Sequence, residues 1–333
     1  MNIGIIGYGY WGPNLVRNFS LVNNCKVSMV SDFRQERLAI VSKSYPAISL
    51  TTNSDEILLS KEINAVVIAT PVFTHFALAK KALENGKHVL LEKPMTSTVK
   101  EAEELMNLAK QKNLLLMVDH TFLYTGAVKK MKTLINDGTI GDIRYFDSSR
   151  INLGLFQPDI NVLWDLAPHD ISILFNLVNA KPYSVNATGI SHTQNGIENI
   201  AYLTINYQKD FIAHFSCSWT SPVKLRTMLV GGDKKMMVFN DLEPSEKIKI
   251  YDTSYSYKTD EEKNRLLVDY RTGDIFIPKV ESKEALLGMA EDFVNSALNR
   301  KEPLSTAQAG LEVIKILEAS QKSIKNKGQE IIL

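Results

Sequence analysis

The sequence predicts a two-domain α/β protein, with a parallel-sheet domain over residues 1–120 and an α+β domain with a large open antiparallel sheet over residues 121–333. Three observations predict this fold class. An apolar run near the N-terminus leads through a glycine-rich turn into a helical pattern, strands and helices alternate up to about residue 120, and after residue 185 apolar strands follow one another through short turns. Alternation with helices is typical of parallel sheets, and successive hairpins are typical of antiparallel ones.

The first strand and its turn carry the first functional signal. The apolar run over residues 3–6 is too short for a helix, and it continues into Gly7-x-Gly9-x-x-Gly12 and a helix over 14–19 behind Pro13. The first glycine permits a tight turn, the second lets a pyrophosphate approach the backbone, and the third lets the helix pack closely on the strand. We therefore predict a Rossmann dinucleotide-binding domain; a glycine turn made for packing alone is the alternative. The candidate cofactor contacts here are Gly7, Tyr8, Gly9, Tyr10, Trp11 and Gly12.

The second strand, over residues 26–31, indicates which dinucleotide binds. It ends at Asp32, near the distance at which a ribose-binding acid is expected. A carboxylate there accepts hydrogen bonds from both ribose hydroxyls and repels a 2′-phosphate, which favours NAD. Arg34, two residues later, could bind that phosphate instead, so NADP stays open; a solvated loop arginine is the other interpretation.

The third apolar strand, over residues 63–69, is buried on both faces, as a central parallel strand must be. It runs into Thr70-Pro71, and because open α/β sheets bind ligands at the carboxyl ends of their strands, we expect these two residues to border the nicotinamide. The alternative is a simple strand-ending proline. His75 precedes a helix over 76–85 and is included among the cofactor candidates, with a structural role as its alternative.

The next strand, over residues 88–91, delivers Glu92-Lys93-Pro94 to the same edge of the sheet. Most lysines are solvated surface residues, but Pro94 restricts the conformation of Lys93, and this position in a dinucleotide fold favours a functional role. Glu92 and Lys93 are therefore also cofactor candidates. A helix over 99–112, capped by Ser97 or Thr98, and a strand over 114–118 follow, and the alternation stops after Asp119-His120.

The second domain begins with a helix over 125–137 and a strand over 143–151. In the run from Trp164 to Asp170, Asp165 and His169 lie four residues apart and share one face if the run is helical, although Pro168 is best tolerated in a first turn. Strands over 200–207, 211–219, 226–230 and 236–239 and helices over 283–299 and 306–325 complete the chain, with Trp219 expected in the core. Candidate substrate contacts are Tyr124, Arg150 and Asn152; their alternatives are a packed tyrosine and a solvated strand end.

Composition narrows the class of function. The 333 residues include 38 Lys and Arg and 37 Asp and Glu, which gives no support to nucleic-acid or membrane-surface binding and favours a small-molecule ligand. Two distant cysteines, Cys25 and Cys217, support neither a disulfide framework nor a cysteine zinc site, and we predict no metal. No apolar run reaches the ~18 residues of a membrane helix, and the first strand leaves no room for a signal peptide, so we expect a cytoplasmic protein.

Four motifs together resemble one family across the whole chain, the glucose–fructose oxidoreductase/inositol dehydrogenase (Gfo/Idh/MocA) family. They are Gly7-x-Gly9-x-x-Gly12, Thr70-Pro71 with His75, Gly86-Lys87-His88-Val89 before Glu92-Lys93-Pro94, and Asp165-x-x-x-His169. Three runs are similar to the subgroup of nucleotide-sugar biosynthesis: residues 9–14 (GYWGPN), 164–170 (WDLAPHD) and 218–224 (SWTSPVK).

The resemblance implies an NAD-dependent dehydrogenase. Oxidising a secondary alcohol removes a hydride from carbon and a proton from oxygen. In such enzymes the corresponding lysine and histidine contact the reacting hydroxyl, so Lys93 would stabilise the alkoxide, His169 would act as general base and Asp165 would orient the substrate or the histidine; Lys93 and His169 could exchange roles. Oxidation at C3 of a UDP-N-acetylhexosamine is the leading hypothesis.

Three alternatives stay open: a dehydrogenase of a free polyol, inositol or sugar, an NAD-dependent glycoside hydrolase, and a non-catalytic NAD-sensing regulator. The open sheet face and the family together imply a homodimer or homotetramer.

Overall fold

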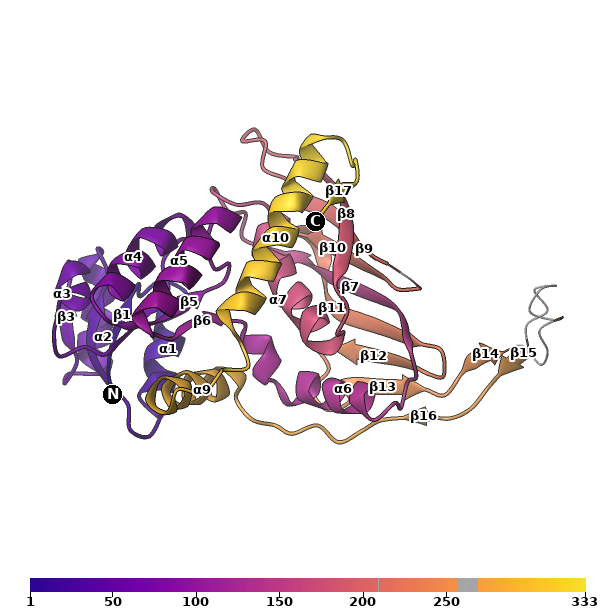
Figure 1. Cartoon of the computed structure of the whole chain (residues 1–333), viewed down its shortest axis with the longest axis horizontal. Coiled ribbons are helices and arrows are strands. Elements are labelled where there is room, and N and C mark those ends of the chain that lie inside the picture. Colours follow the sequence, from indigo (N-terminus) through magenta and orange to yellow (C-terminus); the bar gives the residue numbers. More distant parts are fainter. Residues whose placement is uncertain (209, 257–260, 262–268) are drawn as a thin grey trace. The chain divides into compact units, whose positions relative to one another are not determined.

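A computed structural model describes residues 1–208, 210–256, 261 and 269–333 (Figure 1). The chain forms two compact units. The first comprises Met1–Tyr124 and Lys283–Lys315, and the second comprises Thr125–Ser282 and Ile316–Leu333. The units therefore differ from the predicted split at residue 120, because a late segment of the chain packs on the N-terminal unit. In that segment Phe293 meets Phe19 edge to face, with ring centroids 6.0 Å apart.

The first unit contains the predicted parallel sheet. Its six strands lie in the order β3-β2-β1-β4-β5-β6, and all neighbours pair in parallel. Each residue of β4 is buried, which fits its place at the centre. The strands are β1 (Asn2–Ile6), β2 (Lys26–Ser31), β3 (Ser49–Thr51), β4 (Ala65–Ile68), β5 (His88–Glu92) and β6 (Leu116–Asp119). The predicted Rossmann fold is confirmed.

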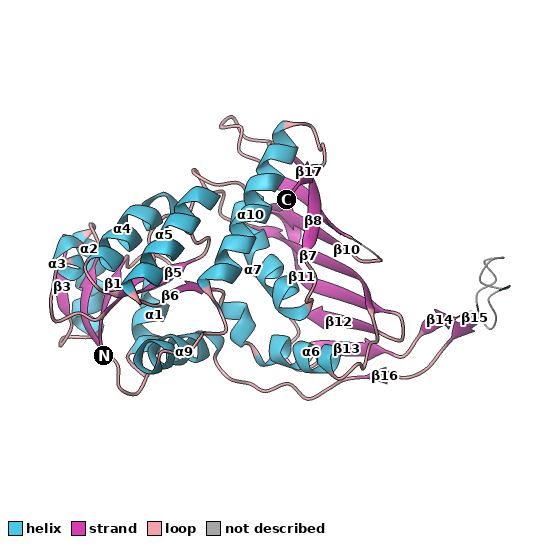
Figure 2. Ribbon diagram, in the orientation of Figure 1, coloured by secondary structure: helices cyan, strands magenta, loops and turns pink. Residues whose placement is uncertain are grey.

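The helices of the first unit follow the predicted order (Figure 2). They are α1 (Gly12–Phe19), α2 (Gln35–Ser44), α3 (Asp55–Leu58), α4 (Val72–Glu84), α5 (Val99–Lys112), the 3₁₀ turn η1 (Thr121–Tyr124), α9 (Ala285–Asn299) and the first half of α10 (Ala307–Lys325). Thr98 and Glu101 form a reciprocal capping box at the start of α5, as expected of a threonine followed by a glutamate three residues later. Helix α4 begins directly after Pro71, four residues before the predicted start, so His75 lies inside it.

The second unit contains a sheet of nine described strands, in the order β16-β13-β12-β11-β7-β10-β9-β8-β17. They are β7 (Ile143–Leu153), β8 (Pro182–Ile190), β9 (Ile200–Tyr207), β10 (Ile212–Ser218), β11 (Thr220–Gly232), β12 (Met236–Asn240), β13 (Ile248–Tyr251), β16 (Ile275–Phe276) and β17 (Ile331–Ile332). The prediction of a purely antiparallel sheet is wrong at one pair, since β7 and β10 run parallel. The chain leaves β7 through helix α7 (Val162–Leu177), and this crossover returns β8 in the direction of β7. The antiparallel pairs β8–β9 and β9–β10 then make β10 parallel to β7.

The two faces of this sheet differ in burial. Ala213, Phe215 and Cys217 of β10 are buried on the face toward α7. On the opposite face Tyr202 stacks on His214, and Tyr202 and Ile212 are exposed. The unit also contains α6 (Gly126–Asn136) and a two-stranded sheet of β14 (Ser254–Ser256) and β15 (Asp269–Arg271). Throughout the described ranges, no helix combines the length and apolar character required to span a bilayer.

Candidate active site

The glycine turn after β1 fits a bound pyrophosphate. Gly7 has φ +100°, and a Cβ at this position would meet the carbonyl oxygen of Ala69 at 2.4 Å; a Cβ at Gly12 would meet the carbonyl of Gly7 at 2.6 Å. At Gly9 the nearest atom to an added Cβ lies 3.7 Å away on Arg34, so the loop has open space at this point. Trp11 precedes α1 without a side-chain cap, which leaves the first N–H groups of the helix for an anion.

The aromatic residues of the turn have different positions. The side chain of Tyr8 is buried, while Tyr10 is 80% exposed and packs edge to face on the half-exposed Trp11. Tyr8 can therefore reach a cofactor through its backbone, whereas Tyr10 and Trp11 present side chains beside the loop.

Asp32 lies at the end of β2 beneath this turn. Its Oδ2 accepts the backbone N–H of Tyr8 at 2.7 Å, and Arg34 donates through Nε to Oδ1 and through Nη2 to Oδ2, both at 2.9 Å. Burial of the carboxyl favours its neutral form, but the hydrogen bonds from Arg34 and Tyr8 outweigh burial and lower the pKa of Asp32. The residue is thus a carboxylate, the form that binds ribose hydroxyls.

His75 joins two of the strand ends at the site. Its Nε2 lies 2.8 Å from the carbonyl of Thr70 and its Nδ1 lies 3.0 Å from the carbonyl of Pro94. The ring is 1% exposed, and burial lowers its pKa. Direct contact between this ring and a cofactor conflicts with its burial, so we correct the prediction: His75 positions the segments at Thr70-Pro71 and Lys93-Pro94.

Acidic residues surround Lys93 at the ends of β5 and β6. Glu92 pairs in register with Asp119, and the backbone N–H of Lys93 donates to Glu92 Oε2 at 3.2 Å. The Oγ1 of Thr121 donates to Asp119 Oδ1 at 2.5 Å. His120 is 1% exposed, and burial together with the charge of Lys93 lowers its pKa to about 4. The lysine is therefore set among two carboxyl groups and a neutral imidazole.

In the second unit, α7 carries the other two catalytic candidates. The helix starts at Asn161, whose Oδ1 accepts the N–H of Trp164 at 3.1 Å, and it is continuous through Pro168. Asp165 and His169 are thus one helical turn apart, as the sequence spacing predicts. The indole Nε1 of Trp219 donates to Asp165 Oδ2 at 3.0 Å and fixes that carboxylate.

The predicted substrate contacts have mixed outcomes. Arg150 is buried and forms a bidentate pair with Asp170 through Nε and Nη2, so its burial conflicts with the predicted sugar contact. Tyr124 is also buried, and its hydroxyl donates to Asp292 at 2.6 Å, which supports the packed alternative. Asn152 at the end of β7 is half-buried and stays a candidate.

Two family models match this chain. One, described as an oxidoreductase family with an NAD-binding Rossmann fold, matches residues 1–120, and the other, the GFO/IDH/MocA C-terminal domain, matches residues 128–238. The chain belongs to the GFO/IDH/MocA oxidoreductase family. Its first domain is therefore an NAD(P)-binding Rossmann domain, as the glycine turn and Asp32 predict.

Individual members of the GFO/IDH/MocA family resemble this chain at modest sequence identity. The UDP-N-acetylglucosamine 3-dehydrogenase of Acidithiobacillus ferrooxidans is 30% identical over 215 residues, which are 62% of this chain and 64% of that protein. The scyllo-inositol 2-dehydrogenase (NADP(+)) of Bacillus subtilis is 27% identical over 223 residues, 63% of this chain and 60% of that protein. The matches thus span just under two thirds of these relatives.

A solved structure of a GFO/IDH/MocA relative agrees in fold over nearly the full length. The UDP-N-acetylglucosamine 3-dehydrogenase from Acidithiobacillus ferrooxidans superposes with a TM-score of 0.79 over 98% of each chain, at 24% identity. This likeness supports the fold of both domains.

Sequence reasoning assigned no role to three residues of these sites: Asp119, His120 and Trp219. Asp119 ends β6 and His120 follows it, so their position at the end of a buried strand was a usable signal. Trp219 is 54 residues from Asp165, and the sequence indicates only its burial.

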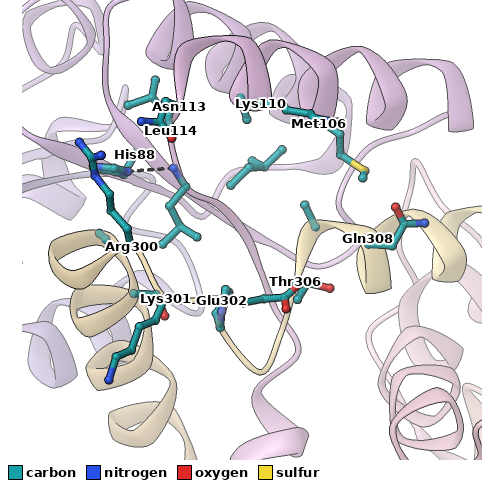
Figure 3. Close-up of a pocket in the computed structure, with 17 residues that line it drawn as sticks. His88, Met106, Lys110, Asn113, Leu114, Arg300, Lys301, Glu302, Thr306 and Gln308 are labelled. Carbon is teal, nitrogen blue, oxygen red and sulfur yellow. Dashed lines mark hydrogen bonds between the residues drawn. The ribbon is translucent and has the colours of Figure 1, made fainter.

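A pocket of about 460 Å³ lies elsewhere in the first unit (Figure 3). It is lined at the amino-terminal starts of β5 and β6 by His88 and Leu116, and by Arg300 and Thr306 from the segment between α9 and α10. The Nδ1 of His88 accepts the N–H of Leu115 at 2.9 Å, and burial and the charge of Arg300 lower the pKa of His88. This pocket is at the edge of the sheet opposite to the glycine turn.

Proposed function

We propose that this protein is an NAD(P)-dependent dehydrogenase that oxidises a secondary ring hydroxyl, at C3 of a nucleotide-linked sugar such as a UDP-N-acetylhexosamine, to a ketone. The proposal rests on two groups of ionisable residues in one chain. Lys93 lies at the carboxyl edge of an NAD(P)-binding sheet, and Asp165 and His169 lie on one face of α7. A binding protein needs the glycine turn alone.

Each candidate has a role that its surroundings support. Oxidation of the alcohol releases a hydride from carbon and a proton from oxygen, and bound NAD(P) supplies the hydride acceptor. The ammonium of Lys93 stabilises the developing alkoxide. His169 takes the hydroxyl proton as general base, and Asp165, held by the indole of Trp219, orients the substrate or the histidine.

The substrate class is supported by resemblance. The sequence runs at residues 9–14, 164–170 and 218–224 resemble nucleotide-sugar enzymes, and one relative is named as a UDP-N-acetylglucosamine 3-dehydrogenase. A second candidate function, oxidation of an inositol or other free polyol, is favoured by the inositol dehydrogenase of Bacillus subtilis, which matches a similar share of this chain.

The test offers NAD or NADP and a panel of UDP- and dTDP-sugars, free sugars and inositols to the purified protein, and follows absorbance of the reduced nicotinamide. We expect reduction with a UDP-N-acetylhexosamine alone. Reduction with polyols alone establishes the second candidate. Release of free sugar without net reduction identifies a glycoside hydrolase, and cofactor binding without any turnover identifies a regulator.

Substitution separates chemistry from cofactor binding. Lys93→Met and His169→Asn should each lower turnover by at least about 100-fold, because each removes a proton-handling group. NAD(H) affinity, measured by fluorescence titration, should stay within a few-fold of the wild type for His169→Asn. Full turnover in either variant contradicts the assigned role.

We further propose a cytoplasmic homodimer or homotetramer whose keto-sugar product enters polysaccharide biosynthesis. The exposed sheet face around Tyr202 supports the assembly into an oligomer. The free thiols of Cys25 and Cys217 support a reducing compartment such as the cytoplasm. Light scattering on the eluting protein measures the assembly, and a monomer at micromolar concentration contradicts it.

A further inference from the structure

The pocket of about 460 Å³ at the amino-terminal starts of β5 and β6 has no part in the proposed reaction (Figure 3). Helix α5 supplies one wall, and the segment between α9 and α10 supplies the facing wall. All the described residues that line it belong to the first unit. Its volume lies in the range of ~300–1,000 Å³ that sites for small ligands occupy. The pocket therefore has room for a small organic molecule.

His88 presents a hydrogen-bond donor at this pocket. Its Nδ1 accepts the backbone N–H of Leu115 at 2.9 Å, the bond drawn as a dashed line in Figure 3. A ring nitrogen that accepts a hydrogen bond carries no proton, so the proton of this imidazole lies on Nε2. The Nε2 donates to no residue in the described part of the chain. Because His88 is half-buried and lines the pocket, this N–H is a fixed donor for a ligand.

The guanidinium of Arg300 lies beside this ring. Figure 3 shows the two side chains next to each other, and the charge of Arg300 contributes to the lowered pKa of His88. Arg300 follows the last turn of α9 with φ +54°, and its side chain has no acceptor among the residues that the structure describes. Two neighbouring groups thus offer N–H donors to the same space. An oxyanion is the group that accepts from both.

The charges along the pocket favour a ligand with a single negative charge. Its described lining includes three cations and one carboxylate: Lys110, Arg300, Lys301 and Glu302. None of the three cations forms an ion pair within the described ranges. Helices α5 and α9 end at the pocket and α10 begins there, and a helix end carries about half a charge, negative at the C-terminus and positive at the N-terminus. Roughly one to two positive charges remain, which a monoanion balances.

The walls between the charged groups are apolar. They consist of Met106 and Ala109 from α5, Leu116 from β6, and Ala297 and Pro303 from the facing wall. Ala109, Leu116 and Ala297 are each less than a tenth exposed, so they form a firm surface. An inorganic anion would leave this surface in contact with water, whereas a hydrocarbon group would cover it. The ligand therefore combines an oxyanion with an apolar body.

We propose that this pocket binds a small organic monocarboxylate, with its carboxylate between Nε2 of His88 and the guanidinium of Arg300 and its hydrocarbon part along the apolar wall at Met106 and Leu116. The site lies at the edge of the sheet opposite to the glycine turn, so it is separate from the cofactor site. It uses residues of the first unit alone and does not depend on the dehydrogenase function proposed above.

Calorimetry on the full chain tests the ligand class, with hexanoate as the probe and with NAD at saturation to fill the cofactor site. We expect hexanoate to bind. Hexanamide has the same shape without the charge and should bind at least about tenfold more weakly. Butyrate is two methylenes shorter and should also bind about tenfold more weakly. Inorganic phosphate has no hydrocarbon part and should bind more weakly than hexanoate.

Substitution tests the location. Arg300→Asn removes the guanidinium and suits the backbone, because asparagine tolerates a positive φ. Hexanoate affinity should fall by about tenfold or more. Lys112→Gln is the matched control: it removes one positive charge at the end of α5, outside the lining of the pocket, and should leave the affinity within about twofold of the wild type.

NMR of the histidine ring nitrogens gives a second reading of the location. The resonance of Nε2 of His88, assigned by its absence in His88→Gln, should shift when hexanoate is added to the wild type. This measurement needs no change at Arg300, so it decides the matter if circular dichroism shows that Arg300→Asn does not fold.

Four results overturn the proposal. They are no binding of hexanoate by the wild type at millimolar concentration, equal affinities for hexanoate and hexanamide, an affinity for phosphate equal to that for hexanoate, and hexanoate binding that neither depends on Arg300 nor shifts the resonance of His88. None of these measurements follows turnover, so a failed search for a dehydrogenase substrate leaves them interpretable.

Discussion

At the residue scale, one indole N–H fixes the carboxylate of Asp165. Trp219 is almost fully buried, and its ring lies 5.6 Å from that of Phe156, centroid to centroid. Trp219→Phe keeps an aromatic ring but removes the donor, so we expect turnover to fall about tenfold or more, as loss of a hydrogen bond to a charged group implies. Phe156→Leu removes the ring contact and keeps the donor, and turnover should change little. Steady-state kinetics measure both; equal losses in the two variants contradict a role for the N–H.

The buried groups around Lys93 also predict an unusual dependence of stability on pH. Asp119 has a raised pKa of about 6, so the folded state binds more protons than the unfolded state, and its contribution to stability is lost as pH rises through about 6. His120 has a depressed pKa of about 4, so the unfolded state binds more protons, and its contribution grows as pH rises from about 4 toward 6.5. The two slopes oppose each other in the same pH range.

Substitution of the groups of one kind should reveal the pH dependence of stability that the other kind contributes. In the double variant Glu92→Gln/Asp119→Asn, which removes both carboxyl groups with raised pKa values, the free energy of unfolding should rise by up to about 3 kcal/mol between pH 4 and 6.5. In His120→Asn it should fall over the same range. Urea titrations across this pH range measure both slopes. The same slope in both variants contradicts the assignment of opposite shifts.

Asp32 sets the choice of dinucleotide at this scale. Asp32→Asn removes the charge that repels a 2′-phosphate and releases Arg34 from its ion pair. We expect the ratio of NADP to NAD affinity to increase about tenfold or more, an effect of ~1.4 kcal/mol. Glu84→Gln, at the far end of helix α4, is the control and should leave the ratio unchanged. Fluorescence titration with both cofactors measures it, and an unchanged ratio for Asp32→Asn contradicts the role.

At the element scale, the start of α7 connects stability to the catalytic candidates. Asn161 caps the helix with its Oδ1 and donates through Nδ2 to Glu198 and Gln321. Asn161→Ala should cost about 1–2 kcal/mol and also lower turnover, because α7 carries Asp165 and His169. Thr98→Ala at the start of α5 should cost about 1 kcal/mol with turnover retained. Thermal unfolding measures the loss of stability and steady-state kinetics measure the loss of turnover in each variant. Equal losses of turnover in Asn161→Ala and Thr98→Ala contradict a connection between the α7 cap and catalysis.

The elements also show how far sequence reasoning extends. Alternation of apolar runs predicts every strand of the parallel sheet except the short β3, and a capping Ser97 or Thr98 predicts the start of α5, because these signals are local. The parallel pairing of β7 with β10 is a long-range choice that no local pattern contains. The same holds for Arg150: its polar character at a strand suggests a ligand, while the partner that buries it, Asp170, is known only from the fold.

At the scale of the whole molecule, the first unit is discontinuous in sequence. Residues 283–315 supply α9, which packs on α1 and η1, and Ser305, whose hydroxyl donates to the carbonyl of Val118. The fragment 1–124 alone should therefore expose apolar surface, bind NAD weakly and aggregate. The same fragment joined to residues 283–315 by a flexible linker should recover cofactor binding. Calorimetry with NAD measures both, and full binding by the shorter fragment contradicts the dependence.

This discontinuity has a consequence for synthesis of the chain. The ribosome completes the glycine turn, Asp32 and Lys93 early, but 191 further residues follow Tyr124 before Lys315 is made. At ~5–20 residues per second, that interval lasts roughly 10–40 s. For most of this time the nascent cofactor domain lacks α9, the helix that covers Phe19, so chaperones that recognise exposed apolar surface have their longest access to the domain before α9 emerges.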